Sequence, residues 1–357
     1  VVLSKVAALF VDGRYMIQAV NEVNKNIFEI VSITEVSPAE WLSTKLVKNN
    51  SIITFDPWLH SITQINDLKD RIKVPVILKE GRNLVDTIWH DKPKKNIKKV
   101  NFLGKAHTSL GHEEKISIII KELKKQNLNH AVITLPDSIS WLLNIRGNDI
   151  PHVPTVQSFA IINRDHSVDL FVSTAKLSKS LLSNLGTHVR CHTKNRFKTF
   201  VKKLMGKIFI DPNTCPLVIQ SLLNQRKTII IHGSDPCILP KSIKNKVEIE
   251  GSKKAHLLDG LAMAEFLYWF SKKSTEDGLN EIKIVQSLEA KRKKSKLLKD
   301  ISFDTICGSG PNGAIVHYRV NTGSNRLIKK DDLILIDSGG QYEFGTTDIT
   351  RTLSVGQ

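Results

Sequence analysis

The order of apolar and polar positions along the chain predicts a mixed α/β protein. Short apolar runs rich in β-branched residues alternate with stretches whose apolar positions recur at helical spacing. One such stretch, residues 112–126, has its apolar side chains on a single helical face, at Ile116, Ile119, Ile120 and Leu123. Two more helical stripes follow beyond residue 246, at Leu258, Ala262, Phe266, Trp269 and Phe270 and at Ile282, Val285 and Leu288. Core packing explains both stripes better than a cofactor site does.

Three pairs of similar segments predict an internal duplication. In each pair, a strand-like segment recurs 154 to 161 residues later. The pairs are 1–18 with 160–178, in which Leu9-Phe10-Val11 matches Leu170-Phe171-Val172, then 52–57 with 208–212, and 74–79 with 228–232. We expect both members of the first pair to form two strands separated by a polar turn. Three matches in one order at a similar offset favour two homologous α/β modules over shared α/β patterning alone.

Changes in this pattern set the expected domain boundaries. In both copies of the middle pair, Asp-Pro follows the strand directly, which predicts a helix with Asp as N-cap and Pro in the first turn. A bridge rich in Lys, Asn and Gly at 92–110 precedes the helix at 112–126. We therefore expect module I at 1–108, module II at 109–245 and a third domain, with a different pattern, at 246–357.

The formal charge of +17 does not predict a nucleic-acid surface. Of the 52 basic residues, 40 are Lys and 12 are Arg, and aromatic residues are only 6% of the chain. Base-reading surfaces favour Arg, and platforms for stacked bases need exposed aromatic side chains. The densest basic runs, 92–99 and 291–296, are typical of a linker and of a solvated helix face. We expect no specific nucleic-acid partner.

The remaining composition points to a cytoplasmic protein with reduced thiols. No apolar run approaches the roughly 18 residues of a membrane helix, and no secretory leader is recognisable. The four cysteines lie far apart without a CxxC pair, which predicts free, mostly buried thiols. They are Cys191, Cys215, Cys237 and Cys307. The chain begins at Val1 in a strand-like run without an initiator Met, which predicts a trimmed start.

Candidate chemistry lies near the end of the chain. The first constellation is a Gly-rich turn, 308–313, which we expect to feed a strand carrying His317. A P-loop is excluded, because no Lys-Ser/Thr follows the glycines and no helix is indicated. A histidine alone is more often structural than catalytic.

Two aspartates form the second constellation. Asp337 ends an apolar strand before two glycines, and Asp348 lies among strand-forming threonines. If their segments are adjacent strands joined by a turn, the two carboxylates come close together and repel each other unless a cation lies between them. Hard divalent ions such as Mn²⁺ accept such oxygen ligands. Each aspartate alone fits a turn or cap as well, but together with His317 they favour a metal site.

These residues resemble a known family. The strings GSGPNGAIVHY and LILIDSGGQYEFGTTDITRT are similar to the catalytic domain of Xaa-Pro aminopeptidases, in the pita-bread metallopeptidase group. The strings VDGRYMIQA, WLLNIRGNDI and EIEGSKKAHLLDGLA extend the similarity over nearly the whole chain. The resemblance implies the long, three-domain form, aminopeptidase P, with two creatinase-like α/β modules before the catalytic domain.

The resemblance also implies an activity and a site. The activity is metal-dependent removal of the first residue from peptides with proline second, by a cytoplasmic homodimer. Asp337 and Asp348 would be two of five protein ligands of a paired divalent metal centre, usually manganese, with Asp348 bridging both ions. His317 would bind and polarise the substrate as a catalytic residue. Thr350 and Arg351 would be supporting residues.

The chain departs from the family pattern in its ligand set. The remaining family ligands, one His and two Glu, have no counterpart in a matching motif of this sequence. We therefore expect the chain to be truncated at both ends, inactive by itself as a peptidase, and left with exposed strand edges and poor stability in its third domain. A non-catalytic peptide-binding module and the product of an interrupted gene are the alternatives. Retention of Asp337, Asp348 and His317 favours descent from an active enzyme.

Overall fold

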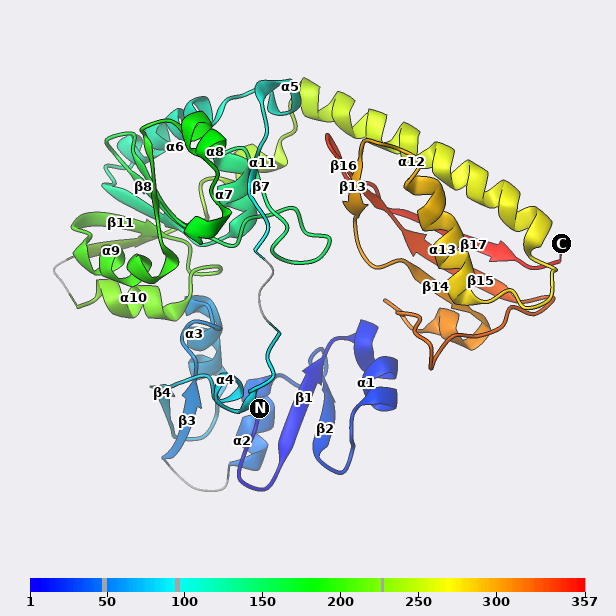
Figure 1. The fold of residues 1–357 in the computed structure, drawn as a ribbon. Helices are drawn as coiled ribbons and strands as arrows, with labels where there is room; N and C mark the ends of the chain where they lie inside the picture. The colour runs from blue at the N-terminus through cyan, green and yellow to red at the C-terminus, as the bar shows by residue number, and fades with distance from the viewer. Residues whose placement is uncertain (47–49, 94–96, 226–227, 357) are drawn as a thin grey trace. The chain divides into compact units, whose positions relative to one another are not determined.

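The computed structural model describes residues 1–46, 50–93, 97–225 and 228–356 (Figure 1). The chain divides into two compact units, one formed by Val1–Trp41 with Glu248–Gln357 and the other by Leu42–Val247. Each unit has helices, strands and hydrophobic core residues of its own. The predicted division into three domains at 108 and 245 stays a prediction.

The unit formed by Leu42–Val247 is built on a six-stranded mixed sheet with the strand order β10-β9-β8-β6-β11-β12. The strands are β6 (His130–Ile133), β8 (Phe159–Asn163), β9 (Val168–Phe171), β10 (Val189–His192), β11 (Gly206–Ile210) and β12 (Thr228–His232). β8 runs antiparallel to both of its neighbours, and the other strand pairs are parallel.

Helices cover both faces of this sheet. Successive strand residues point to opposite faces, and Ile161 and Ile162 on β8 accordingly belong to two different cores. One core contains side chains of α6 (His112–Lys125), α7 (Pro136–Leu142) and α8 (Lys179–Leu185), and the other contains those of α9 (Phe197–Lys203) and α10 (Leu217–Leu223). Burial on both faces explains why the strands are nearly continuous apolar runs. The helix predicted over 112–126 is confirmed, with its apolar face buried.

Smaller elements complete this unit. β3 (Ser51–Phe55) pairs in parallel with β4 (Val76–Glu80), and α3 (Ile62–Arg71) connects them. The short β5 (Asn101–Phe102) pairs with β7 (Ile145–Arg146). Further helices of this unit are α4 (Leu84–Ile88), α5 (Lys105–Thr108) and α11 (Ile238–Ser242), and α2 (Pro38–Lys45) contains the boundary between the two units.

The matched segments of the predicted duplication form matching elements. Segments 52–57 and 208–212 contain β3 and β11, and segments 74–79 and 228–232 contain β4 and β12. Leu9-Phe10-Val11 and Leu170-Phe171-Val172 lie on or directly after β1 (Ala7–Val11) and β9. Each β3/β4-type pair is parallel and is joined by one helix, α3 or α10.

The two repeated helices begin against each other with reciprocal backbone contacts. The N–H of Ile62 donates to the carbonyl of Cys215 at 3.2 Å, and the N–H of Leu217 donates to the carbonyl of His60 at 2.9 Å. A second reciprocal pair joins Thr63 to Pro212 and Val218 to Pro57. The two matched segments therefore meet through equivalent backbone groups: N–H groups at the start of each helix donate to carbonyl groups just before the start of the other.

The helix starts predicted at Asp-Pro are wrong. The side chains of Asp56 and Asp211 accept hydrogen bonds from the backbone N–H of Trp58 and Asn213, both at 2.9 Å, which closes a turn two residues further on. Such Asx turns compete with helix capping. The helices begin later, at Ile62 and Leu217, and Ser61 caps α3 in a capping box with Gln64.

The other unit contains two stretches of chain. Its N-terminal stretch has β1, which pairs in parallel with β2 (Phe28–Ser32), and α1 (Met16–Glu22) between them. The two strands predicted within residues 1–18 are not both present. Val2 makes only an isolated bridge to Ala7, and the residues after β1 form a 3₁₀ turn and α1. In the second copy, both strands form, as β8 and β9.

The C-terminal stretch packs two helices on small antiparallel sheets. The long α12 (Lys246–Lys273) is followed by α13 (Glu281–Arg292). β14 (Ile306–Ser309), β15 (Leu333–Ser338) and β17 (Ile349–Ser354) form one antiparallel sheet with β15 in the centre. β13 (Leu298–Ile301) pairs with β16 (Gly340–Tyr342). As expected, the described β17 lies at an edge of its sheet and most of its residues are exposed.

The core of this stretch confirms the two helical stripes. Phe266 and Phe270 of α12 and Leu288 of α13 are buried together with Ile334 and Ile336 of β15. Trp269 and Val285 pack against this core from the side and are only partly buried.

The reading of 291–296 as a solvated helix face is wrong at one position. Arg292 is completely buried, whereas Lys293 and Lys294 are exposed. The other dense basic run, 92–99, includes residues 94–96, which lie outside the described residues.

The expectation for the four cysteines is met. Cys215, Cys237 and Cys307 are buried free thiols and Cys191 is partly buried, and burial raises the pKa of all four. Within the described ranges, no helix has both the length and the apolar character needed to cross a membrane.

Candidate metal centre

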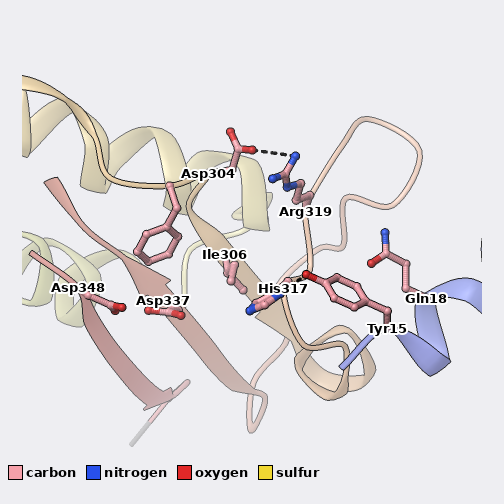
Figure 2. A pocket seen from close by; sticks show the side chains of 9 residues that line it. Tyr15, Gln18, Asp304, Ile306, His317, Arg319, Asp337 and Asp348 are labelled. Carbon is pink, nitrogen blue, oxygen red and sulfur yellow. Dashed lines mark hydrogen bonds and ion pairs between the residues drawn. The ribbon is translucent and has the colours of Figure 1, made fainter. Parts of the chain in front are cut away.

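The two aspartates lie on neighbouring strands. Asp337 is on β15 and is paired in register with Thr350 of β17, while Asp348 directly precedes β17. Their strands are adjacent, as predicted, but a third strand, β16, lies between them in sequence and pairs with β13. Figure 2 shows the two carboxylates pointing toward one another. Burial, and then the charge and hydrogen bond of Asp337, raise the pKa of Asp348 above its usual value.

The two supporting residues lie directly beside this pair. The hydroxyl of Thr350 donates to Oδ1 of Asp337 at 2.8 Å, which fixes the orientation of that carboxylate. Arg351 points away from this bond, and its Nη1 donates to the backbone carbonyl of Thr350 at 2.7 Å. Of the two, Thr350 contacts a carboxylate of the pair directly.

His317 lies on a loop and not on a strand, so the expected Gly-rich turn feeding a strand is wrong. Residues 310–314 form a 3₁₀ helix after β14, and the chain continues irregularly as far as β15. His317 has a left-handed backbone, with φ of 59°, a conformation that is uncommon outside glycine. Its Nδ1 lies 2.9 Å from the hydroxyl of Tyr15.

Of the predicted site residues, His317, Asp337 and Asp348 line one cavity of about 410 Å³, and Thr350 and Arg351 are not part of its lining. This volume is in the range of small-ligand pockets. Figure 2 shows the ring of His317 between Asp337 and Tyr15 in this pocket. The pocket lining consists of Tyr15, Gln18, Phe303, Asp304, Ile306, His317, Arg319, Asp337 and Asp348.

The sequence reasoning missed four polar residues of the lining. Asp304 and Arg319 form an ion pair with a separation of 3.0 Å, and no pattern in the sequence connects them. Tyr15 and Gln18 belong to the string VDGRYMIQA, which indicated the family but carried no prediction of a site. That string was the available signal, because it places a phenol and an amide on consecutive turns after β1.

A buried ionic network lies directly behind Asp337. Because side chains alternate along a strand, Ser338 faces the core, where its hydroxyl accepts a hydrogen bond from Arg292 at 3.0 Å. Arg292 also donates to both carboxylate oxygens of Asp259, at 2.6 and 3.1 Å. The hydroxyl of Tyr342 on β16 donates to Asp259 at 3.0 Å. The network thus joins α12, α13, β15 and β16 next to the aspartate pair.

The donor set is only partly suited to a metal. The carboxylates of Asp337 and Asp348 are hard oxygen donors close enough to repel each other, which fits a divalent cation between them. In the part of the chain that the structure describes, however, no three His, Cys, Asp or Glu side chains are grouped so that they could hold a metal ion. The resemblance implies that Asp337 and Asp348 are two of five ligands, and this role stays a prediction.

Comparison with known proteins agrees with this architecture. Residues 91–248 match the family model of the creatinase/prolidase N-terminal domain, and residues 250–357 match that of metallopeptidase family M24. A protein of Laccaria bicolor named probable Xaa-Pro aminopeptidase P is 32% identical over 98% of the chain.

Solved structures show the same fold. The X-prolyl aminopeptidase of Caenorhabditis elegans, described as a cytosolic enzyme with a dinuclear active site, matches 100% of the chain with 28% identity and a TM-score of 0.92. The Xaa-Pro dipeptidase of Bacillus anthracis, at 20% identity and a TM-score of 0.54 over 69% of the chain, shares the fold.

Residues 91–248 are thus similar to the creatinase-like N-terminal domain, and residues 250–357, which carry the aspartate pair, to the domain of metallopeptidase family M24. The chain as a whole is similar to the Xaa-Pro aminopeptidases P. It spans 56% of the length of the Laccaria relative and 60% of the Caenorhabditis enzyme.

Proposed function

We propose that the protein to which this chain belongs is a metal-dependent aminopeptidase that removes the first residue of peptides with proline second. The observation that carries the proposal is the convergence of Asp337, Asp348 and His317 on one pocket of a chain similar to Xaa-Pro aminopeptidases over nearly its whole length. The proposal includes a cytoplasmic location and a homodimer, as the family resemblance implies.

Asp337 and Asp348 would hold a pair of divalent ions, which we propose to be manganese. Asp348 would bridge the two ions, and a His and two Glu that have no counterpart among the described residues would complete the set. When bound, such ions lower the pKa of water and stabilise negative charge on a carbonyl oxygen. Carboxylate ligands suit manganese better than they suit softer metals.

The residues of this chain would position the ligands and the peptide. Thr350 donates to Asp337 and leaves the second oxygen of that carboxylate to face the pocket. His317, exposed at the pocket and held by few contacts of its own, would bind the peptide carbonyl near the scissile bond. A substrate with proline second presents an imide without an N–H, so the scissile bond itself offers only its carbonyl oxygen for hydrogen bonding.

The proposal can be tested with the complete protein from its source. It should release the first residue of a Xaa-Pro peptide and leave a matched Xaa-Ala peptide largely intact. Chelation should abolish cleavage, and Mn²⁺ should restore it. The Asp348→Ala variant should lose bound metal and at least the 10–100-fold in activity that substitutions around metal sites cost.

Asp331→Asn is a matched control for the loss of a carboxylate. Asp331 is exposed, lies outside the pocket and has a left-handed backbone, with φ of 70°, that Asn tolerates. This variant should keep its metal and its activity. Equal cleavage of both peptides, or full activity after chelation, would refute the proposed function. Absence of any cleavage would refute it as well and would favour a peptide-binding role without catalysis.

A further inference from the structure

Glu281 is a buried carboxylate outside the pocket that collects hydrogen bonds from one particular segment of chain. It is the first residue of α13 and is 0% exposed. Its oxygens accept from the backbone N–H of Ser309 at 2.7 Å, from Oγ of the same residue at 2.9 Å, and from the backbone N–H of Arg326 at 3.1 Å. They also accept from Nδ2 of Asn312 at 3.1 and 3.2 Å and from the hydroxyl of Tyr318 at 3.0 Å.

The donors all belong to the segment 309–326, which carries His317. Asn312 and Tyr318 lie on either side of His317, and Ser309 and Arg326 lie at the two ends of the segment. Ser309 ends β14 and pairs with Ile334 of β15, whereas residues 315–326 belong to no strand. Around His317, the backbone bonds within the segment run from Ile315 to Asn312 and from Tyr318 to Ile315. The shape of the loop therefore depends on the carboxylate inside it.

His317 needs such support because of its backbone. A residue other than glycine at φ of 59° persists only where its surroundings impose that conformation. The ring itself is exposed, and its contacts are a hydrogen bond and a ring contact with Tyr15. The side chain of the next residue, Tyr318, is buried and anchored to Glu281.

The network continues to the strand of the aspartate pair. Nη1 of Arg326 donates to Oγ of Ser309 at 3.0 Å, and its guanidinium binds both oxygens of Asp332 at 2.6 and 3.0 Å. Asp332 directly precedes β15, which carries Asp337. One buried carboxylate is thus joined to the histidine loop at several points and, through one arginine, to the start of the ligand-bearing strand.

We propose that Glu281 is a positioning residue that holds the loop 309–326 so that His317 faces the pocket. A carboxylate in the first turn of a helix can also serve only to stabilise that helix. Here, however, all of these donors come from outside α13, so the charge of Glu281 organises the loop. The catalytic consequence rests on the proposed function; the structural one does not.

The test uses the complete protein and a double-mutant cycle. Glu281→Gln puts an amide N–H among donors and removes the charge, so kcat/KM for a Xaa-Pro peptide should fall about 10–100-fold, with bound metal unchanged. The kcat/KM of His317→Ala should fall by at least the same factor. Because Glu281 acts through His317, the double variant should be no worse than His317→Ala alone. Losses that multiply in the double variant would overturn the proposal.

Two more variants separate positioning from loss of the fold. Glu289→Gln is the matched control, since Glu289 is on the same helix and accepts from Thr305, outside the loop; it should stay within about threefold of the parent. Tyr318→Phe keeps the carboxylate of Glu281 and removes a hydroxyl that contacts Glu281, Asn312 and Ser324. It should show a smaller loss of kcat/KM, and no further loss when it is combined with His317→Ala. If Glu281→Gln does not fold, Tyr318→Phe takes its place in the double-mutant cycle.

Hydrogen exchange gives a readout that needs no activity. Glu281→Gln should speed amide exchange within 309–326 and leave α12 unchanged, and Glu289→Gln should not affect the loop. Unchanged exchange in a folded Glu281→Gln protein would overturn the positioning role. If the parent protein cleaves no Xaa-Pro peptide, the proposed function fails, and exchange still decides the role of Glu281.

Discussion

Two aspartates have opposite pKa shifts because their surroundings differ in burial and in the charge of the neighbouring side chain. The hydrogen bond from Arg326 holds the pKa of Asp332 below its usual value. Burial and the adjacent carboxylate of Asp337 raise that of Asp348. Asp332, paired with an arginine, therefore keeps its negative charge down to a lower pH. Asp348 is repelled by the neighbouring carboxylate, and a cation between the two would remove that repulsion.

Asp332 predicts a specific dependence of stability on pH. Its folded-state pKa is lowered, so its contribution is fully present above the unfolded value of about 3.9 and is lost as pH falls through the folded value. At pH 7, Asp332→Asn should lower the free energy of unfolding by about 1–3 kcal/mol, the value of hydrogen bonds to a charged group.

Urea unfolding of the parent and the variant across pH checks this prediction. The difference between them should be constant from about pH 7 to pH 5 and shrink below about pH 4. The neighbouring Asp331→Asn, which removes an exposed carboxylate, should show no such trend. A difference that grows as the pH falls would contradict the ion pair with Arg326 as its source.

At the scale of elements, the two faces of β15 have different neighbours. Asp337 faces the pocket, and the next residue, Ser338, reaches the buried network of Asp259 and Arg292. This ion pair is fully buried, and removing one member of such a pair leaves an uncompensated charge. The packing of α12 and α13 behind the strand therefore depends on both charges.

Asp259→Ala should destabilise the protein by about 3–5 kcal/mol, because Arg292 would remain buried without its partner. Glu265→Ala is the comparison on the same helix, since it breaks a largely exposed pair with Lys294 and should cost less than about 1 kcal/mol. Chemical denaturation of both variants measures the two costs. Similar losses of stability in both variants would mean that the buried pair stabilises the protein no more than the exposed pair does.

The sequence could predict the elements that a single periodicity governs. The helix over 112–126 and the two stripes of α12 and α13 were predictable, because an apolar face at helical spacing has few alternatives. The start of α3 was not predictable, because an aspartate such as Asp56 can either cap a helix or close a turn. Which of the two forms depends on tertiary contacts of the segment. The burial of Arg292 among exposed lysines was equally hidden, since its partner, Asp259, is 33 residues away.

The site was predictable only as far as the resemblance and strand pairing extended. The convergence of Asp337 and Asp348 followed from adjacent strands, which is a local inference. Tyr15 reaches His317 across 302 residues of sequence, and Glu281 organises a loop that begins 28 residues later. Such contacts depend on tertiary packing, which no periodicity in one sequence encodes.

At the scale of the whole molecule, the ligand count decides what the 357 residues can do by themselves. Octahedral oxygen sites for ions such as Mn²⁺ take about six donors. Among the described residues, the adjacent carboxylates at the pocket are those of Asp337 and Asp348, and the third pocket carboxylate, Asp304, is paired with Arg319. The isolated chain should therefore bind Mn²⁺ weakly and leave a Xaa-Pro peptide uncleaved. Calorimetric titration and a peptide assay measure both. Appreciable hydrolysis would show that other groups complete the site.

The reciprocal contact between α3 and α10 has a consequence for how the two repeats stay together. Equivalent groups that donate and accept in turn are the arrangement that two identical subunits adopt about a twofold axis. Free subunits could keep so small a contact only at high concentration. Joined in one chain, the partners meet at an effective concentration on the order of millimolar. Covalent linkage can thus maintain a pairing that a dimer of separate modules would lose on dilution.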